Sequence, residues 1–241
     1  MADPDDPILE RLDRVRTEVA AAATAAERAP SDVRVLLATK TQPAERIITA
    51  IRAGATLIGE NRAQEVVAKA DELAGIPHEL HFIGHLQANK INQLLGRITC
   101  LQTLDSIDLA GKLQSRLEPG DGHLDVMIQV NVSGESSKSG VAPEAALPLL
   151  HDLEQFPRLT VCGFMTIGLN SPDRGAVRSG YRLLAQLRDS ARDQRLPGAD
   201  GATELSMGMS GDFAEAIAEG ATIVRLGSAV FGPRGDGDRV T

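Results

Sequence analysis

Short apolar runs rich in β-branched residues alternate along the chain with longer segments that have helical spacing. The runs predict eight strands, at 33–38, 55–59, 80–84, 99–103, 125–132, 159–164, 203–206 and 222–226. The segments between them predict helices at 43–53, 62–73, 87–95, 106–117, 143–155, 174–194 and 213–219. A further helix, 7–28, is predicted within the N-terminal segment 1–30, before the first strand.

This alternation predicts a parallel sheet, because strands joined through helices pair by right-handed crossovers. Eight strand–helix units in 241 residues fit a single (β/α)8 barrel better than an open, doubly wound sheet. We find no interdomain linker, so the prediction is one domain over 1–241. Its Gly-rich, charged end, 233–241, is expected to be a mobile tail.

Several helix boundaries carry chemical signals. Pro43 stands where the first helical residue is expected. Asn61 followed by Gln64 resembles a capping box. Ser106 precedes a predicted helix as an N-cap, and Gly220 follows one and can adopt the left-handed conformation of a C-terminal cap.

Composition and charge narrow the possible partners. The chain is 42% apolar and 24% charged, as soluble globular proteins are. Its 33 acidic against 25 basic residues give a net charge of -8, which argues against binding nucleic acid or an anionic membrane surface. No apolar run approaches the roughly 18 residues of a membrane span, and no secretory signal is evident. Two cysteines, Cys100 and Cys162, indicate a reducing, cytosolic location.

Candidate chemistry lies just after the strands, because barrel enzymes build their sites at the carboxyl ends of the strands. Lys40 closes the run VLLATK. It either extends into water or points into a pocket, where desolvation would leave its amine neutral enough to form a Schiff base. Arg225 is surrounded by apolar residues in TIVRL and must be paired, in a structural salt bridge or with a cofactor.

The loops after the last two strands are rich in glycine and serine. Barrel enzymes often bind phosphate there through backbone N–H groups. Ser210 can cap the helix that begins near Phe213, and Gly227 with Ser228 opens a second turn. These groups predict either a phosphate site or a pair of ordinary turns.

Other motifs fail on their spacing. His78, His81 and His85 lack the order and the partner ligands of a metal site. GMSGD lacks the last Gly of a nucleophile elbow, and no His follows Ser210. SGESSKSG is not a phosphate-binding P-loop, and both cysteines read as buried apolar residues.

Seven motifs, in the same order along the chain, resemble those of a known protein family. LLATKTQP, IGENRAQE, HFIGHLQANK, VNVSGESSKSG, GFMTIG, LSMGMSGDF and VRLGSAVFG closely resemble the motifs of the pyridoxal phosphate homeostasis protein family, from Val33 to Gly232. The resemblance implies a barrel similar to the N-terminal domain of alanine racemase. It also implies that pyridoxal 5′-phosphate (PLP) is bound as an internal aldimine.

Residue by residue, the resemblance implies the following roles. Lys40 would form the Schiff base, Asn61 would lie near the cofactor, and Ser210, Gly227 and Ser228 would bind the phosphate. Arg225 would lie beside the pyridine nitrogen. Apart from the resemblance, His85 follows the third predicted strand at the barrel mouth, where it is expected to orient a loop or contact the cofactor, with proton transfer as the alternative role. A guanidinium can only donate, so the ring nitrogen would stay unprotonated and would be a weak electron sink.

The resemblance implies a cytosolic protein that buffers or delivers PLP and influences amino-acid and keto-acid balance, without established turnover. PLP-dependent apo-enzymes are the possible recipients, and we expect a monomer or a weak dimer. The main alternative is an amino-acid racemase, which would need a second acid/base Tyr from a C-terminal domain. We expect no such domain here, and Tyr181, the single tyrosine, is predicted in mid-helix, far from a strand end. A barrel enzyme that binds phosphate without PLP would leave Lys40 unexplained.

Overall fold

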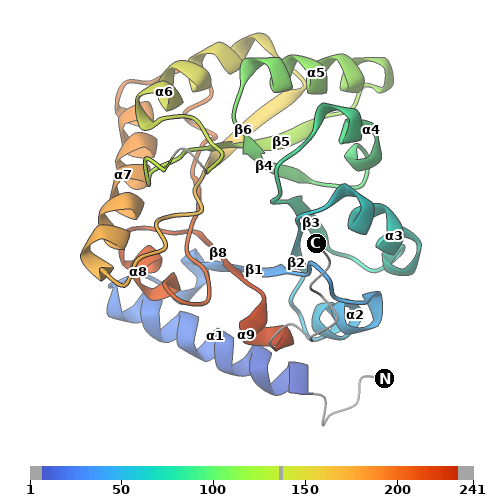
Figure 1. The fold of residues 1–241 in the computed structure, drawn as a ribbon, viewed down its shortest axis with the longest axis vertical. Coiled ribbons are helices and arrows are strands. Elements are labelled where there is room, and N and C mark those ends of the chain that lie inside the picture. Colours follow the sequence, from blue (N-terminus) through green and yellow to red (C-terminus); the bar gives the residue numbers. More distant parts are fainter. Residues whose placement is uncertain (1–6, 136–137, 233–241) are drawn as a thin grey trace.

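Eight parallel strands close into a barrel in sequence order, with β8 paired to β1 (Figure 1). The computed structural model describes residues 7–135 and 138–232. The strands are β1 (Arg34–Ala38), β2 (Leu57–Glu60), β3 (Glu79–Phe82), β4 (Cys100–Leu104), β5 (Leu124–Gln129), β6 (Leu159–Met165), β7 (Glu204–Ser206) and β8 (Ile223–Leu226). The predicted (β/α)8 barrel is therefore confirmed. The expected mobile tail, 233–241, lies outside the described residues.

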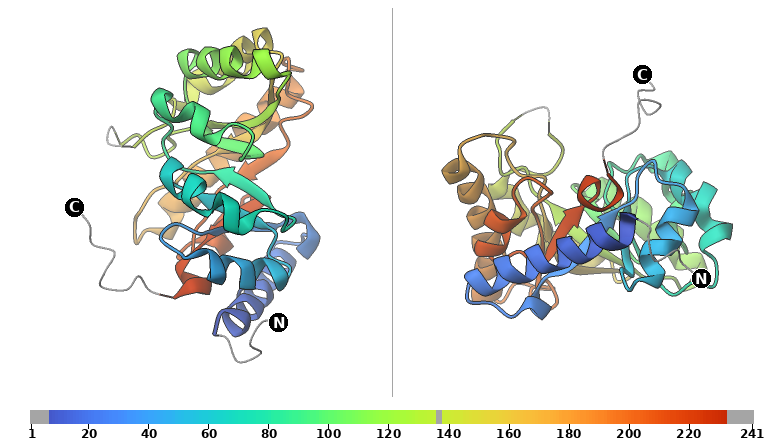
Figure 2. Two further views of the ribbon diagram at one scale, coloured as in Figure 1. Left: turned by 90° about the vertical axis from the view of Figure 1, so that its right-hand side faces the viewer. Right: turned by 90° about the horizontal axis from the view of Figure 1, so that it is seen from below.

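Helices surround the barrel on its outside (Figures 1 and 2). They are α1 (Pro7–Ala25), α2 (Ala44–Arg52), α3 (Ala63–Leu73), α4 (Ile91–Leu94), α5 (Ile107–Leu117), α6 (Pro143–Asp152), α7 (Arg174–Asp193), α8 (Phe213–Ala218) and α9 (Ser228–Phe231). The predicted N-terminal helix is confirmed as α1, which packs against α2, α8 and α9. Arg28, just beyond α1, donates from Nη1 to the carbonyl oxygens of Ile217 (3.0 Å) and Ala221 (2.7 Å), which ties this segment to α8.

The alternation of side chains along each strand divides the core into two parts. A large cluster fills the space between the sheet and the helices, and a small one fills the barrel. The small cluster comprises Leu36, Leu57, Cys100, Met127, Met165 and Ile223. On β8, Ile223 belongs to the inner cluster and Val224 to the outer one, so Arg225 faces the barrel interior.

Two of the predicted boundary signals are confirmed. The Ser106 Oγ accepts the backbone N–H of Leu109 at 3.3 Å and caps α5. Gly220 follows α8 with a φ of +99°, in the left-handed region that glycine enters without steric cost. Pro43 is the residue before the first helical residue of α2, one position from its predicted place.

The capping box predicted at Asn61 and Gln64 is wrong. Helix α3 begins at Ala63, and its N-cap Arg62 makes no side-chain capping bond. Asn61 belongs instead to the end of β2, where its carbonyl packs against Gly84; a Cβ at Gly84 would lie 2.0 Å from that oxygen. Tertiary packing of two loops therefore overrides the local signal.

Two short helices also differ from the prediction. The segment predicted as one helix over 87–95 is a 3-10 turn, Ala88–Lys90, followed by the single turn of α4. Helix α9 follows β8 directly and was predicted as a turn.

Candidate functional site

A cavity of about 280 Å³ lies at the carboxyl ends of β1, β7 and β8. It contains five of the seven predicted site residues: Lys40, Ser210, Arg225, Gly227 and Ser228. We call this cavity the Lys40 cleft. The structure therefore brings together residues that are separated by up to 188 positions in the sequence, because strands β1 and β8 are neighbours in the closed barrel.

The Lys40 cleft is electropositive. Lys40 and Arg225 both line it, and none of the described residues along its wall is Asp or Glu. Ser210 and Ser228 add hydroxyl groups, and Gly211 and Gly227 leave the backbone accessible. An amine, a guanidinium and hydroxyl and N–H donors on the described part of the wall favour a small anionic ligand such as a phosphate ester.

Arg225 is held inside the barrel mouth by neutral groups. Its Nη1 donates to the Ser206 Oγ at 2.9 Å, and its Nη2 donates to the Thr166 carbonyl at 2.7 Å. Burial lowers the pKa of Arg225 to about 10, so the side chain remains a cation at neutral pH. The sequence left open a structural salt bridge for Arg225. Among the described residues, no carboxylate forms an ion pair with it.

A buried chain of hydrogen bonds extends from Arg225 across the barrel. The Ser206 Oγ accepts from Arg225 and donates to the Gln102 Oε1 at 2.6 Å. The Gln102 Nε2 lies 2.8 Å from the His81 Nδ1. Burial lowers the pKa of His81 to about 4, so this ring is neutral and its Nδ1 accepts the amide proton of Gln102. Three side chains, from β7, β4 and β3, thus form a hydrogen-bonded chain that holds the guanidinium of β8 in its orientation.

The loop after β7 owes its shape to Asp212. The Asp212 Oδ1 accepts the Met209 N–H at 2.7 Å, and Oδ2 accepts the Tyr181 hydroxyl at 2.8 Å. The prediction that Ser210 caps α8 is wrong, because the N-cap residue is Asp212. The Ser210 side chain is exposed at the cleft, and its hydroxyl has no partner among the described residues.

Tyr181 corrects a second expectation. It lies in α7, as predicted, but its fully buried side chain reaches the strand ends, with the hydroxyl on Asp212 and the ring against Gly168. Burial and the negative charge of Asp212 raise the pKa of Tyr181 well above its usual range. The hydroxyl is therefore a neutral structural donor. The sequence contained no signal for this contact, because 31 positions separate the two residues.

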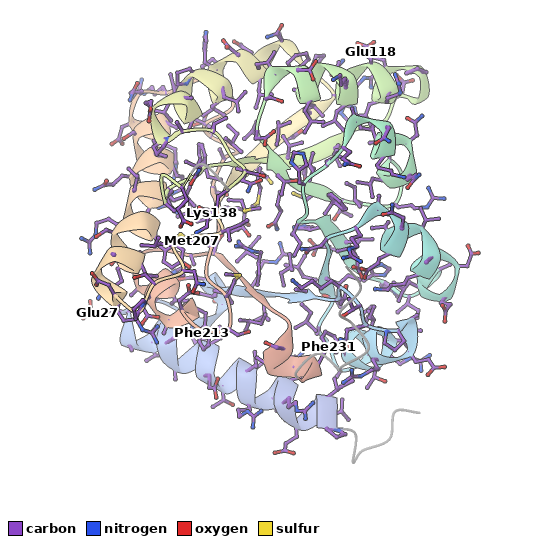
Figure 3. All side chains as sticks on the ribbon, viewed as in Figure 1. Glu27, Glu118, Lys138, Met207, Phe213 and Phe231 are labelled. Atoms are coloured by element: carbon purple, nitrogen blue, oxygen red, sulfur yellow. The ribbon has the colours of Figure 1, made fainter. Side chains whose placement is uncertain are left out.

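The two sides of the cleft are joined by Arg46 of α2. Its Nη1 donates to the Gln42 Oε1 at 2.5 Å, in the loop after β1. Its Nη2 donates to the carbonyl of Phe231 at 2.7 Å, and the guanidinium lies over the Phe231 ring. Phe231 is the last residue of α9 (Figure 3). Close approach also requires Gly227, where a Cβ would lie 3.0 Å from the Ala38 oxygen.

The other two predicted residues lie outside the Lys40 cleft. Asn61 and His85 line a separate cavity of about 150 Å³ beside Phe82 and Lys90. Lys138, on the loop after β5, donates to the Gly168 carbonyl at 2.9 Å and does not line the Lys40 cleft (Figure 3).

Residues 7–135 and 138–232 contain neither a metal cluster nor a membrane-spanning helix. No three His, Cys, Asp or Glu side chains gather closely enough to hold a metal ion. No helix there combines the length and the apolar character that crossing a bilayer requires.

Comparison with known proteins places this geometry in a family. The family model for the alanine racemase N-terminal domain matches residues 11–235. The pyridoxal phosphate homeostasis protein of Aquifex aeolicus is 40% identical over 93% of this chain and 97% of its own length. That of Pseudomonas aeruginosa is 40% identical over 94% and 96%. The chain belongs to the pyridoxal phosphate homeostasis protein family.

Solved structures agree with this assignment. A protein of unknown function from Bifidobacterium adolescentis is 40% identical to this family member, with a TM-score of 0.91 over 96% of this chain and 98% of the other. PipY from Synechococcus elongatus, in its structure with PLP bound, is 29% identical with a TM-score of 0.82, over 93% and 100%. An alanine racemase from Clostridium difficile is 11% identical over 92% of this chain and 57% of its own, with a TM-score of 0.68, and shows the shared fold alone.

Proposed function

We propose that this chain binds PLP as a Schiff base on Lys40 and acts in PLP homeostasis as a carrier without catalytic turnover. The observation that carries the proposal is the charge of the Lys40 cleft: an amine and a buried guanidinium, with no carboxylate among its described lining residues. The relatives named above are pyridoxal phosphate homeostasis proteins, and PipY has been solved with PLP bound.

The donor set of the cleft fits each part of this cofactor. An amine is needed for the aldehyde, and Lys40 supplies it. The dianionic phosphate needs several donors, which the Ser210 and Ser228 hydroxyls and the adjacent backbone N–H groups provide. Arg225 offers N–H groups to the ring nitrogen. The volume of about 280 Å³ lies near the small end of ligand cavities, which run from about 300 to 1,000 Å³, and so suits a ligand of one substituted ring.

Attachment and release are one reversible reaction. The Lys40 amine would add through its nitrogen lone pair to the aldehyde carbon, a C=N bond would form, and the aldehyde oxygen would leave as water with the two amine protons. Hydrolysis by the same route regenerates the free amine and free PLP. A site that only captures and returns the aldehyde needs no further acid/base pair, which suits buffering or delivery.

Two features support a carrier rather than an enzyme. When bound, PLP supplies an electron sink whose strength depends on protonation of its ring nitrogen. The Arg225 side chain, cationic and fixed by Ser206 and Thr166, can only donate to that nitrogen and so keeps it unprotonated. A racemase would need a tyrosine as its second acid/base group, but the Tyr181 hydroxyl donates its hydrogen bond to Asp212.

The setting we propose is the reducing cytosol, where the free thiols of Cys100 and Cys162 are stable. The recipients would be apo-enzymes that use PLP, and the carrier would be a monomer or a weak dimer. Asn61 and His85, which line the neighbouring cavity, are proposed to shape the loops beside the cofactor rather than to hold it.

Borohydride reduction tests the attachment. The purified protein incubated with PLP should absorb visible light, and borohydride should fix the cofactor on the peptide that contains Lys40. Lys138, whose amine is bound to Gly168 outside the cleft, provides the matched control: Lys138→Met should still be labelled and Lys40→Met should not. An adduct on a lysine other than Lys40 would overturn the assignment.

A further inference from the structure

The two residues on either side of Lys40 are each held by a carboxylate. The Thr39 hydroxyl donates to the Glu60 Oε1 at 2.7 Å. The Thr41 backbone N–H donates to the Glu65 Oε2 at 2.7 Å. Lys40 is therefore fixed through its neighbours, by one residue at the end of β2 and one in α3.

A single buried cation joins these two carboxylates. The Lys69 Nζ donates to the Glu60 Oε1 at 2.7 Å and to the Glu65 Oε2 at 3.1 Å. Its third hydrogen bond is donated to the Thr39 carbonyl at 3.0 Å. All three ammonium protons therefore bind to Glu60, Glu65 or Thr39. The side chains of Glu60 and Lys69 are buried, and a charge so buried is retained only with good pairing.

The backbone after Lys40 needs such support. Thr41 has a φ of +63°, in the left-handed region, which β-branched residues rarely enter. This conformation turns the chain sharply at the mouth of the Lys40 cleft. The hydrogen bond to Glu65 satisfies the Thr41 N–H in that conformation and opposes a return to a commoner one.

The cluster does this work from outside the barrel. Ile58 packs in the outer core, and Glu60, two positions later on β2, points the same way, toward α3. Neither Glu60, Glu65 nor Lys69 lines the Lys40 cleft; they line a separate cavity of about 460 Å³ beside α3. One further oxygen, Glu60 Oε2, is buried and accepts no hydrogen bond from the described residues.

We propose that Glu60, Glu65 and Lys69 form a positioning cluster for Lys40. The inference rests on the proposed role of Lys40 as the PLP lysine. A lysine amine sits on a flexible four-carbon chain, so its encounter with an aldehyde depends on how well the backbone beneath it is fixed. Fixing the residues on both sides restricts the region that the amine can reach and favours attack within the cleft.

The first test measures the rate of PLP capture. Stopped-flow absorbance would follow wild type, Lys69→Met and Lys69→Arg with free PLP as the probe. Loss of the shared charge-assisted bonds is expected to slow capture by about tenfold in Lys69→Met, and Lys69→Arg should recover part of the rate. Lys112→Met is the matched control, because Lys112 pairs with Asp108 on the exposed face of α5 and should leave capture unchanged.

The second test needs no cofactor. Hydrogen exchange of the Thr41 amide in the PLP-free protein reports the Glu65 contact directly. Exchange should be slow in wild type and Glu65→Gln, which keeps an acceptor, and at least tenfold faster in Glu65→Ala and Lys69→Met. If Lys69→Met fails to fold, the double variant Glu60→Gln/Lys69→Met replaces it, since it removes both buried charges together.

The two hypotheses fail in different ways. If wild type forms no adduct on Lys40, the proposed function is wrong, whatever the Thr41 exchange rates. If wild type is labelled on Lys40 but the folded Lys69 variants match it in capture rate and in Thr41 exchange, the positioning cluster is wrong. Slow capture that Lys69→Arg partly restores, with fast Thr41 exchange in Lys69→Met, would support it.

Discussion

The Tyr181 hydroxyl donates a hydrogen bond to the carboxylate of Asp212, from the middle of α7 to the loop that forms one wall of the Lys40 cleft. The same carboxylate accepts the Met209 N–H. A tyrosine that chemistry alone would suggest as an acid/base group thus shapes the loop that carries Ser210.

The first prediction concerns this contact. Tyr181→Phe keeps the ring in its buried position and removes one hydrogen bond, so unfolding in urea should show a loss of about 1 kcal/mol. Because the Asp212 carboxylate still accepts the Met209 N–H, the loop should keep most of its shape, and PLP affinity should fall only a few-fold. A complete loss of PLP binding in a folded Tyr181→Phe protein would instead place the hydroxyl in direct contact with the cofactor.

The second prediction concerns the phosphate. Ser210→Ala should weaken PLP retention by about tenfold to a hundredfold, the value of one charge-assisted hydrogen bond of roughly 1.5–3 kcal/mol. Ser133→Ala is the control, because the Ser133 hydroxyl donates to the Asn131 Oδ1 in the loop after β5. Retention measured by dialysis should separate the two variants, and equal retention would contradict a phosphate site at Ser210.

The third prediction tests the buried chain behind Arg225. Gln102→Leu removes the acceptor of the Ser206 hydroxyl and the donor to His81, leaving two buried polar groups unpaired. We expect a loss of roughly 2–4 kcal/mol in the free energy of unfolding. With Ser206 released, the guanidinium loses a fixed partner, so the visible band of the PLP complex should also shift. An unchanged band and unchanged stability would show that the chain does not hold Arg225.

The fourth prediction follows from two buried groups that titrate with opposite effects on stability. Burial lowers the pKa of His81 from 6.5 to about 4, with Glu79 and Arg34 facing it. The unfolded chain therefore binds the proton first, and His81 reduces stability as pH falls from 6.5 to 4. Burial raises the pKa of Glu60 from 4.5 to about 7, against the attraction of Lys69. Here the folded chain binds the proton first, so stability falls as pH rises from 4.5 to 7.

The two shifts act in opposite directions over an overlapping pH range, so their contributions to the free energy of unfolding should partly offset each other in wild type. Glu60→Gln should remove one of them: its unfolding free energy should rise with pH between 4.5 and 6.5 more steeply than that of wild type. His81→Asn should show the reverse change in slope. Denaturant unfolding across this pH range measures both, and parallel profiles for all three proteins would contradict the assigned shifts.

These residues also show what the sequence could and could not predict. Position after a strand indicated Lys40, Ser210, Gly227 and Ser228, because a closed parallel barrel brings those strand ends together. Arg225 was indicated by its apolar neighbours within the last strand. Gln102 and Ser206 carried a usable signal, since both are polar residues at inward positions of apolar strands, and their burial demanded partners.

The remaining contacts had no local signal. Lys69 and Glu65 sit in α3 at a spacing typical of a solvent-exposed ion pair, and only the tertiary structure turns that face toward Thr39 and Thr41. The capping box at Asn61 failed for a similar reason, because the contact with Gly84 depends on the arrangement of two loops.

The last prediction is that binding occurs without turnover. Under the proposed function, a cationic Arg225 that donates to the ring nitrogen would remove most of the driving force for taking a proton from a bound amino acid. The Tyr181 hydroxyl, with its pKa raised and its proton on Asp212, cannot serve as a second base. His85 is the remaining strand-end candidate, and it lines a different cavity from Lys40. Racemase or transaminase rates should therefore stay below roughly 0.01 s⁻¹, against an enzyme median of about 10 s⁻¹.

The measurement is α-proton exchange into deuterated water, followed by NMR for the PLP-loaded protein with a panel of L-amino acids. Lys40→Met carried through the same procedure gives the background of free PLP. Exchange at the background rate would support a Lys40 cleft that captures and releases PLP without catalysis. Fast exchange with one amino acid, lost in both Lys40→Met and His85→Ala, would mean that His85 reaches the cleft when substrate is bound. The chain would then be an enzyme, because a base on that side supplies the proton transfer that Tyr181 cannot.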